Sequence, residues 1–142
     1  MSIFSFIKKL FKANISVVSA DKYRFKIEEE YIVEEISEST RDQWMRERHE
    51  KDNVSSLINY DGFHEKFYGR DGMIYYVKEK QLCEIYCEMT FADEYDWIIS
   101  LDQLCEWVLP AKKKMNVPEK ENIKEELLVW LKKKRISAEV TV

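Results

Sequence analysis

The chain holds few side chains of the kinds that bind transition metals or act as nucleophiles: His49, His64, Cys83, Cys87 and Cys105. A zinc site needs four ligands around one ion, with Zn–S bonds of about 2.3 Å. Cys83 and Cys87 are four residues apart in a segment predicted to be a strand, where that spacing extends about 13 Å. We therefore expect the cysteines to be buried as small hydrophobic residues. A helix here would instead bring the two sulfurs together.

A cysteine–histidine pair and a cluster of carboxylates are the other candidates for chemistry. Cys105 and His64 form a nucleophile and base only if the fold brings them together, and nothing in the local sequence supports that. Asp93, Glu94 and Asp96 offer carboxylates for a hard cation or for acid–base work, but lack the glycine and spacing of a calcium loop. We therefore expect no catalytic residue, no metal, no cofactor and no enzyme activity.

Glycine and proline are scarce, with three and two residues respectively. Phosphate-binding loops need several glycines close together, because their backbone amides surround the ligand. This excludes nucleotide binding through such loops. The three cysteines are an odd number and too few for a secreted disulfide scaffold, so we expect a reducing, cytoplasmic environment.

Length and composition predict one folded domain over residues 1–142. The chain is 45% hydrophobic and 13% aromatic, which suffices for a buried core and excludes disorder throughout. Its 23 basic and 27 acidic residues leave a net charge of −4, which does not fit a nucleic-acid coat protein. No segment approaches the roughly 18 uninterrupted apolar residues of a membrane span.

Residues 1–12 have the pattern of a short amphipathic helix. Its lysines lie off the apolar face, which consists of Ile3, Phe6, Ile7, Leu10 and Phe11. Such a helix either packs on the core of its own domain or docks on a membrane surface or a partner. We favour the first alternative, because twelve residues make a weak membrane anchor without a second signal.

The next segments predict an N-terminal hairpin. Residues 14–20 and 23–27 alternate β-branched or aromatic side chains with polar ones, as paired strands do. Residues 28–38 contain six acids and no base, and their pattern fits either a strand or a short helix.

A helix and a loop follow. Residues 40–50 are rich in good helix formers, and Ser39 or Thr40 would serve as the N-cap. Residues 52–62 are rich in Asn, Ser and Asp and favour a loop.

The second half predicts a series of strands. A turn at residues 70–72 precedes strands at 73–77, 82–89 and 95–100. In the middle strand, apolar and polar side chains alternate, typical of a sheet with one buried face. Its predicted buried positions are Cys83, Ile85, Cys87 and Met89, and its predicted exposed positions are Glu84, Tyr86 and Glu88.

The remaining elements complete an α+β fold. Residues 101–108 favour a short helix that Pro110 ends, and residues 112–116 a basic loop. A long helix begins near Pro118 and ends in a run of bases, with a buried stripe at Ile123, Leu127, Trp130 and Leu131. Residues 136–142 predict a closing strand. We expect a single domain with a mostly antiparallel sheet packed with a long C-terminal helix and a short N-terminal helix.

Charge is distributed unevenly along the chain. Residues 82–106 contain seven acids and no Lys or Arg, whereas residues 111–135 contain nine bases and four acids. An acidic surface of this kind suits a protein that binds a basic protein, although solvated strand faces and turns give the same pattern. Direct nucleic-acid binding is less expected, because the overall sign is wrong and the last basic run fits a helix end.

The second half resembles small immunity proteins of bacterial polymorphic toxin systems, of the contact-dependent inhibition type. The resemblance covers roughly residues 70–142. It rests on the order of these features along the chain: two strands, residues 95–102 (YDWIISLD), Trp107 before Pro110, a helix that opens with Val117-Pro118-Glu119 and contains Ile123 and Leu127, and the strand at 136–140. The chain departs from that pattern at Val108 and Val117, where a polar residue and a Ser, Thr or Asp cap are usual.

The resemblance implies a cytoplasmic, non-catalytic protein that binds a co-encoded toxin, often a nuclease, and blocks its active site. Partner contacts would then come from acids at Glu28, Glu29, Glu30, Glu34, Glu35, Asp93, Glu94 and Asp96, with Trp44 or Tyr31 as aromatic anchors. Trp107 and Trp130 are expected in the core. The alternative function is a peripheral membrane or structural adaptor that docks through residues 1–12.

Overall fold

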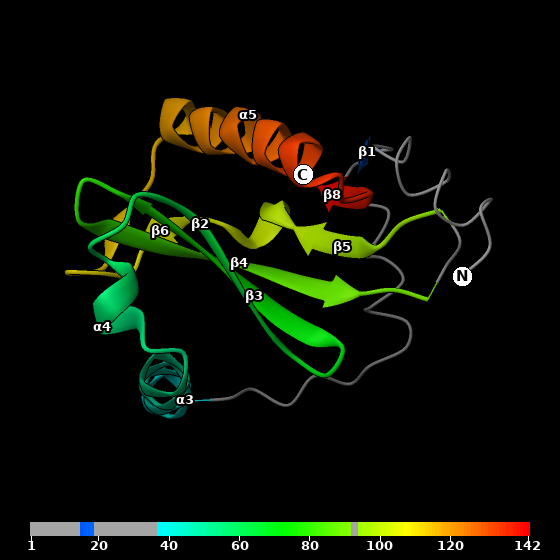
Figure 1. Ribbon diagram of the computed structural model, residues 1–142. Coiled ribbons are helices and arrows are strands. Elements are labelled where there is room, and N and C mark those ends of the chain that lie inside the picture. The colour runs from blue at the N-terminus through cyan, green and yellow to red at the C-terminus, as the bar shows by residue number, and fades with distance from the viewer. Residues whose placement is uncertain (1–14, 19–36, 92–93) are drawn as a thin grey trace.

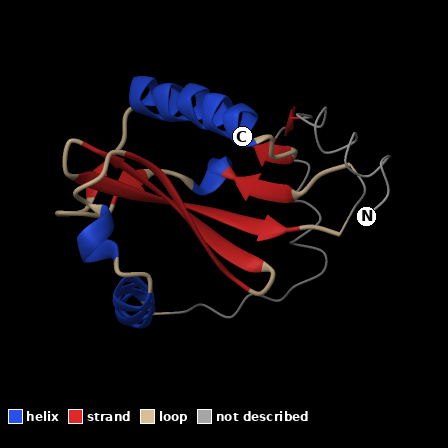
Figure 2. Ribbon diagram, viewed as in Figure 1, coloured by secondary structure: helices blue, strands red, loops and turns tan. Residues whose placement is uncertain are grey.

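The computed structural model describes residues 15–18, 37–91 and 94–142. In this part of the chain a twisted sheet lies between the long helix α5 on one side and the helices α3 and α4 on the other (Figure 1). Helices and strands contribute comparably, and they confirm the predicted α+β class with a mostly antiparallel sheet (Figure 2). The predicted N-terminal helix at residues 1–12 and the segment 28–36 lie outside the described residues.

The sheet has six strands in the order β1-β8-β5-β4-β3-β2. The strands span Ile15–Val18 (β1), Gly62–Tyr68 (β2), Asp71–Lys78 (β3), Gln81–Met89 (β4), Trp97–Ser100 (β5) and Ala138–Thr141 (β8). β2 to β5 form an antiparallel meander, whereas β8 pairs in parallel with both β5 and β1. The predicted strands in the second half are confirmed. The sequence pattern predicts no element for residues 63–69, where most of β2 lies.

Helix α5, Val117–Lys134, has strong signals at both ends. The Asn116 side chain accepts a hydrogen bond from the Glu119 backbone N–H, and the Glu119 carboxylate accepts one from the Asn116 N–H, which completes a capping box. The cap is therefore Asn116, one residue before the expected position at Val117. Glu119 also accepts a bond from Trp107 Nε1 at 2.7 Å. This bond lowers the pKa of Glu119.

The main core lies between α5 and one face of the sheet. Ile123, Leu127 and Leu131 of α5 are buried against that face, as the stripe predicts. Trp130, the fourth predicted position, is half-buried and packs at the edge of the core, with its ring 5.3 Å from that of Phe63. The sheet contributes side chains from β3, β4, β5 and β8, including Ile74, Ile85, Ile99 and Val140. Trp107 is buried, as expected.

The opposite face of the sheet is also buried at one end, so the prediction of one buried face was incomplete. Val54 of α4, Val54–Leu57, packs with Tyr75, Val77 and Leu82 in a second cluster. The predicted loop at residues 52–62 was therefore wrong in its middle and at its end, where α4 and the start of β2 lie. Met89, predicted on the buried face, is exposed at the end of β4.

The segment after β5 differs most from its prediction. The expected helix at residues 101–108 is a single 3₁₀ turn, Leu101–Gln103, followed by strand β6 at Glu106–Trp107. β6 pairs with β7, Lys113–Lys114, inside the predicted basic loop. Backbone hydrogen bonds also join residues 108 and 109 to Leu82, so this segment continues along β4 rather than coiling.

In the first half, β1 confirms the first strand of the expected hairpin over Ile15–Val18, while its second strand lies outside the described residues. Helix α3, Glu38–Lys51, confirms the predicted helix. Its N-cap is Ser37, rather than Ser39 or Thr40, because the Ser37 side chain accepts a hydrogen bond from the Thr40 N–H.

Gly72 occupies a position on β3 that has no room for a side chain. A Cβ there would lie 2.5 and 2.6 Å from two carbons of the Phe67 ring and 3.1 Å from Cys87 Sγ. We expect Gly72→Ala to lower the free energy of unfolding, measured with urea, by about 1–3 kcal/mol. In a Phe67→Leu background the same substitution should cost less, and an equal loss in both backgrounds would contradict this explanation.

Candidate functional site

Helix α3 is attached to the sheet through polar contacts. Among the residues described, it has no buried side chain, and charged residues occur all around it. Its last turn holds Arg48, His49 and Lys51, which suit the negative end of a helix. Without an apolar stripe, this helix cannot be held by hydrophobic burial, so ion pairs and hydrogen bonds must fix its position.

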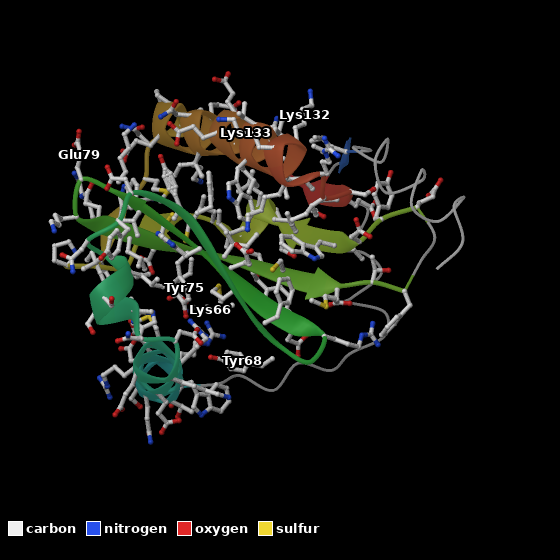
Figure 3. The ribbon with its side chains drawn as sticks, in the orientation of Figure 1. Lys66, Tyr68, Tyr75, Glu79, Lys132 and Lys133 are labelled. Atoms are coloured by element: carbon white, nitrogen blue, oxygen red, sulfur yellow. The ribbon has the colours of Figure 1, made fainter. Side chains whose placement is uncertain are left out.

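Asp52 is the first anchor of α3. It ends the helix as its C-cap and is only 2% exposed. Its carboxylate accepts hydrogen bonds from the hydroxyls of Tyr68 on β2 and Tyr75 on β3. Burial and the Asp52 carboxylate raise the pKa of Tyr75 far above its usual range, so that hydroxyl remains a donor. Figure 3 shows both tyrosines on the side of the sheet that faces α3.

Glu84 of β4 is the second anchor. Its two oxygens pair with Arg48 and with His49 Nε2, the latter at 3.1 Å. The His49 ring also meets the Tyr75 ring edge-on, with centroids 5.9 Å apart. The Arg48 Nε atom is buried without a hydrogen-bond partner among the described residues. The two anchors, Asp52 and Glu84, thus hold the C-terminal half of α3.

A groove of about 850 Å³ runs between α3 and the elements facing it. We call it the α3 groove. Its helix side is formed by Glu38, Arg41, Asp42, Trp44, Met45 and Arg48, and its other side includes Met73, Glu84, Tyr86, Glu106, Val108 and Lys112. The lining combines aromatic rings, methionines and arginines, which are residue types enriched at protein interfaces, with four acids and Lys112.

One ion pair spans the groove. Lys112 Nζ lies 2.8 Å from Asp42 Oδ1 and joins α3 to the segment before β7. The hydrogen bond lowers the pKa of Asp42 and raises that of Lys112. Glu106 and Glu38 raise the pKa of Lys112 further by their charges. The N-terminal half of α3 is thus tied to the rest of the chain by an exposed contact.

A second cavity of about 220 Å³ adjoins the α3 groove and shares Arg48, Met73 and Tyr86 with it. Tyr86 donates a hydrogen bond to Asp71 at 2.8 Å, and Lys66 also lines this cavity. The Lys66 and Tyr68 side chains lie on the α3 side of the sheet, whereas Lys132 and Lys133 lie along α5 on the opposite side (Figure 3).

Beyond α3, the same sheet face carries a row of acids. The pairing register aligns Tyr68, Asp71, Glu88, Ile98 and Glu139 across five neighbouring strands. We call Asp71, Glu88 and Glu139 the acidic row. All three are exposed or half-buried, and Arg70 approaches Glu88 at 3.6 Å.

Of the predicted partner-binding residues, Trp44, Glu94 and Asp96 are described. Trp44 lines the α3 groove, whereas Asp96 accepts a hydrogen bond from the Ser137 N–H at 3.1 Å and ties β5 to the start of β8. Glu94 is exposed beside it. The structure does not bring Asp96 to the groove lining. The others lie outside the described residues: Glu28, Glu29, Glu30, Tyr31, Glu34, Glu35 and Asp93.

Sequence reasoning missed both anchors of α3. The sequence analysis predicts Glu84 only as an exposed acid of its strand. Its neighbours on the same face, Leu82 and Tyr86, are however apolar or aromatic. A carboxylate between such neighbours needs a cation or donors when the face is covered. A carboxylate between apolar neighbours on one strand face is therefore the sequence signal that could have identified Glu84 as an anchor. Asp52 had none, because its partners Tyr68 and Tyr75 are distant in the sequence.

The prediction that the cysteines are buried is confirmed for two of them and wrong for Cys105. Cys83 and Cys87 are buried on β4, and burial raises the pKa of each thiol to about 12. Cys105 is exposed, and His64 Nε2 lies 2.8 Å from the Tyr60 carbonyl oxygen. In the described part of the chain, no three His, Cys, Asp or Glu side chains are grouped so as to hold a metal ion.

Within the described ranges, no helix combines the length and the apolar character needed to cross a membrane.

The chain was compared with protein-family models, with curated proteins and with solved structures, and none of the three comparisons found a match.

Proposed function

We propose that this protein is an immunity protein that binds a co-encoded bacterial toxin and occludes its active site. The resemblance over residues 70–142 supports this, because β3, β4, β5 and β8, on which it rests, lie in one sheet that α5 covers. The surface on the α3 side of that sheet supports it as well. A cytoplasmic, non-catalytic role belongs to the same proposal.

The observation that carries the proposal is the position of Trp44. Its side chain is 52% exposed although it lines the α3 groove. Tryptophan is enriched among the residues that dominate binding energy at protein interfaces. An exposed ring beside a groove with flexible methionines offers a partner both an anchor and an adaptable pocket. The exposed part of the Trp44 ring adds little to the apolar area that the protein buries within its own fold.

The acidic row suggests the kind of toxin. A nuclease must present a positive groove to the phosphates of its substrate, and an acidic surface competes for that groove. Complementary charge also speeds the encounter of the two proteins, which matters for an inhibitor that must act before damage occurs. We therefore propose a nuclease domain as the most suitable partner, with the acidic row beside the α3 groove in the contact.

Co-expression with the product of the adjacent gene tests the proposal. We expect a complex that survives purification, and growth of cells that the toxin alone would kill. Trp44→Ala should weaken the complex about thirtyfold or more, measured by calorimetry, because a buried aromatic anchor is lost. Tyr60→Ala is the matched control, since Tyr60 is an exposed aromatic residue that does not line the groove.

Absence of both a complex and protection would rule out the proposed function. Equal effects of Trp44→Ala and Tyr60→Ala would instead move the interface away from the α3 groove. If the acidic row steers association, the on-rate should fall as salt rises, whereas the off-rate should change much less.

A further inference from the structure

We propose that the α3 groove accepts a basic side chain of the partner, which takes the place of Lys112. This inference rests on the proposed function, because it names the chemistry that the partner presents to the groove. It begins from an ion pair within the chain itself. Lys112 already places an ammonium group between the two sides of the groove and so marks a position that suits a cation.

Carboxylates from both sides of the groove act on that ammonium group. Asp42 of α3 accepts its hydrogen bond at 2.8 Å. Glu38, also of α3, and Glu106 of β6 line the same groove and act on Lys112 through their charges. A lysine or arginine of a partner that entered here would meet the same three acids, so the exchange preserves the charge balance of the groove.

Lys112 is free to leave this position. Its side chain is 43% exposed and lies just before the short strand β7. When it swings into solvent, water replaces its contact with Asp42 at little cost, since exposed ion pairs are weak. The C-terminal half of α3 stays in place when this contact opens, because Asp52 and Glu84 hold that half of the helix.

The remaining lining favours a basic occupant over an acidic one. Arg48 is already paired with Glu84, and Arg41 lies one helical turn from Glu38. An acidic side chain would therefore meet the carboxylates of Glu38, Asp42 and Glu106, while Arg48 is already paired with Glu84. Met45, Met73 and Val108 offer apolar contacts to the aliphatic stem of a lysine or arginine. Trp44 at the same groove would stack on a guanidinium.

A short basic peptide tests this without the toxin. The purified full chain is titrated at low salt with a capped tri-arginine peptide, and with a tri-glutamate peptide as the opposite charge. Tryptophan fluorescence reports binding, and Trp44→Phe identifies the share of the signal that belongs to Trp44. We expect Lys112→Ala to bind tri-arginine about threefold to tenfold more tightly than the unchanged protein, because the internal competitor is gone.

Asp42→Asn should weaken tri-arginine binding, and Lys133→Ala, an exposed lysine on the opposite side of the sheet, should leave it unchanged. Thermal unfolding checks that all variants fold. Equal binding by Lys112→Ala and the unchanged protein, or equal binding of tri-glutamate, would overturn the exchange.

The two proposals fail separately. A toxin complex that depends on Trp44 but is indifferent to Lys112, together with no peptide response, would reject the exchange and leave the proposed function standing. A peptide response without any toxin complex would support the groove chemistry and reject the immunity role.

Discussion

Asp52→Ala is expected to lower the free energy of unfolding by about 2–4 kcal/mol in urea titrations. The carboxylate is buried and accepts from two hydroxyls, so its removal leaves the buried Tyr75 hydroxyl without an acceptor. A hydrogen bond to a charged group contributes more than a neutral one, and an unsatisfied buried donor costs the full desolvation penalty. The loss should also loosen the end of α3, detectable as faster amide exchange in that helix.

The control is Asp61→Ala, an exposed aspartate that accepts one backbone hydrogen bond from the Glu79 N–H. Its loss of stability should be much smaller. The double variant Asp52→Ala with Tyr75→Phe removes the orphaned hydroxyl and should be more stable than Asp52→Ala alone. If the double variant loses as much unfolding free energy as the two single variants together, the two groups act independently.

Leu127→Ala is expected to cost about 3–5 kcal/mol of unfolding free energy and to lower the melting temperature by about 10 °C. Leu127 is fully buried between α5 and the sheet, where the large aromatic and aliphatic neighbours leave little room for the fold to collapse around a smaller side chain. Calorimetry of the purified chain measures both quantities.

Val129→Ala is the matched control on the same helix, because Val129 is 53% exposed. It should change stability by no more than about 0.5 kcal/mol, since surface substitutions seldom do more. Comparable losses in the two variants would mean that α5 does not pack on the sheet through the Leu127 stripe.

Local signals identified the elements whose side chains alternate or recur with a clear period. The α5 stripe at Ile123 and Leu127, and the alternation in β4, each report burial on one side. The predicted helix at residues 101–108 is wrong, although Leu101 and Leu104 are three residues apart, a spacing that also occurs in helices. Backbone hydrogen bonds between residues 108–109 and Leu82 favour its extended path, and no local sequence pattern indicates such a distant partner.

The candidate site was harder to foresee than the fold. Trp44 is a predicted contact residue, but the groove beside it depends on where α3 lies. Polar anchors fix that position, and they produce no periodic pattern in the sequence. Glu84 meets Arg48 only because β4 and α3 are brought together from separate parts of the chain. Proximity of this kind follows from tertiary structure, so propensity and spacing cannot supply it.

The place of β8 between β5 and β1 has a consequence for how quickly the protein forms. Ile15 pairs with Ala138, so this contact joins opposite ends of the described chain, whereas β2, β3 and β4 pair with immediate neighbours. Closing so long a loop carries a large entropy cost and slows folding. The meander should therefore form first and the parallel strands should dock last. Under the proposed immunity function, that docking step would set the earliest moment at which protection begins.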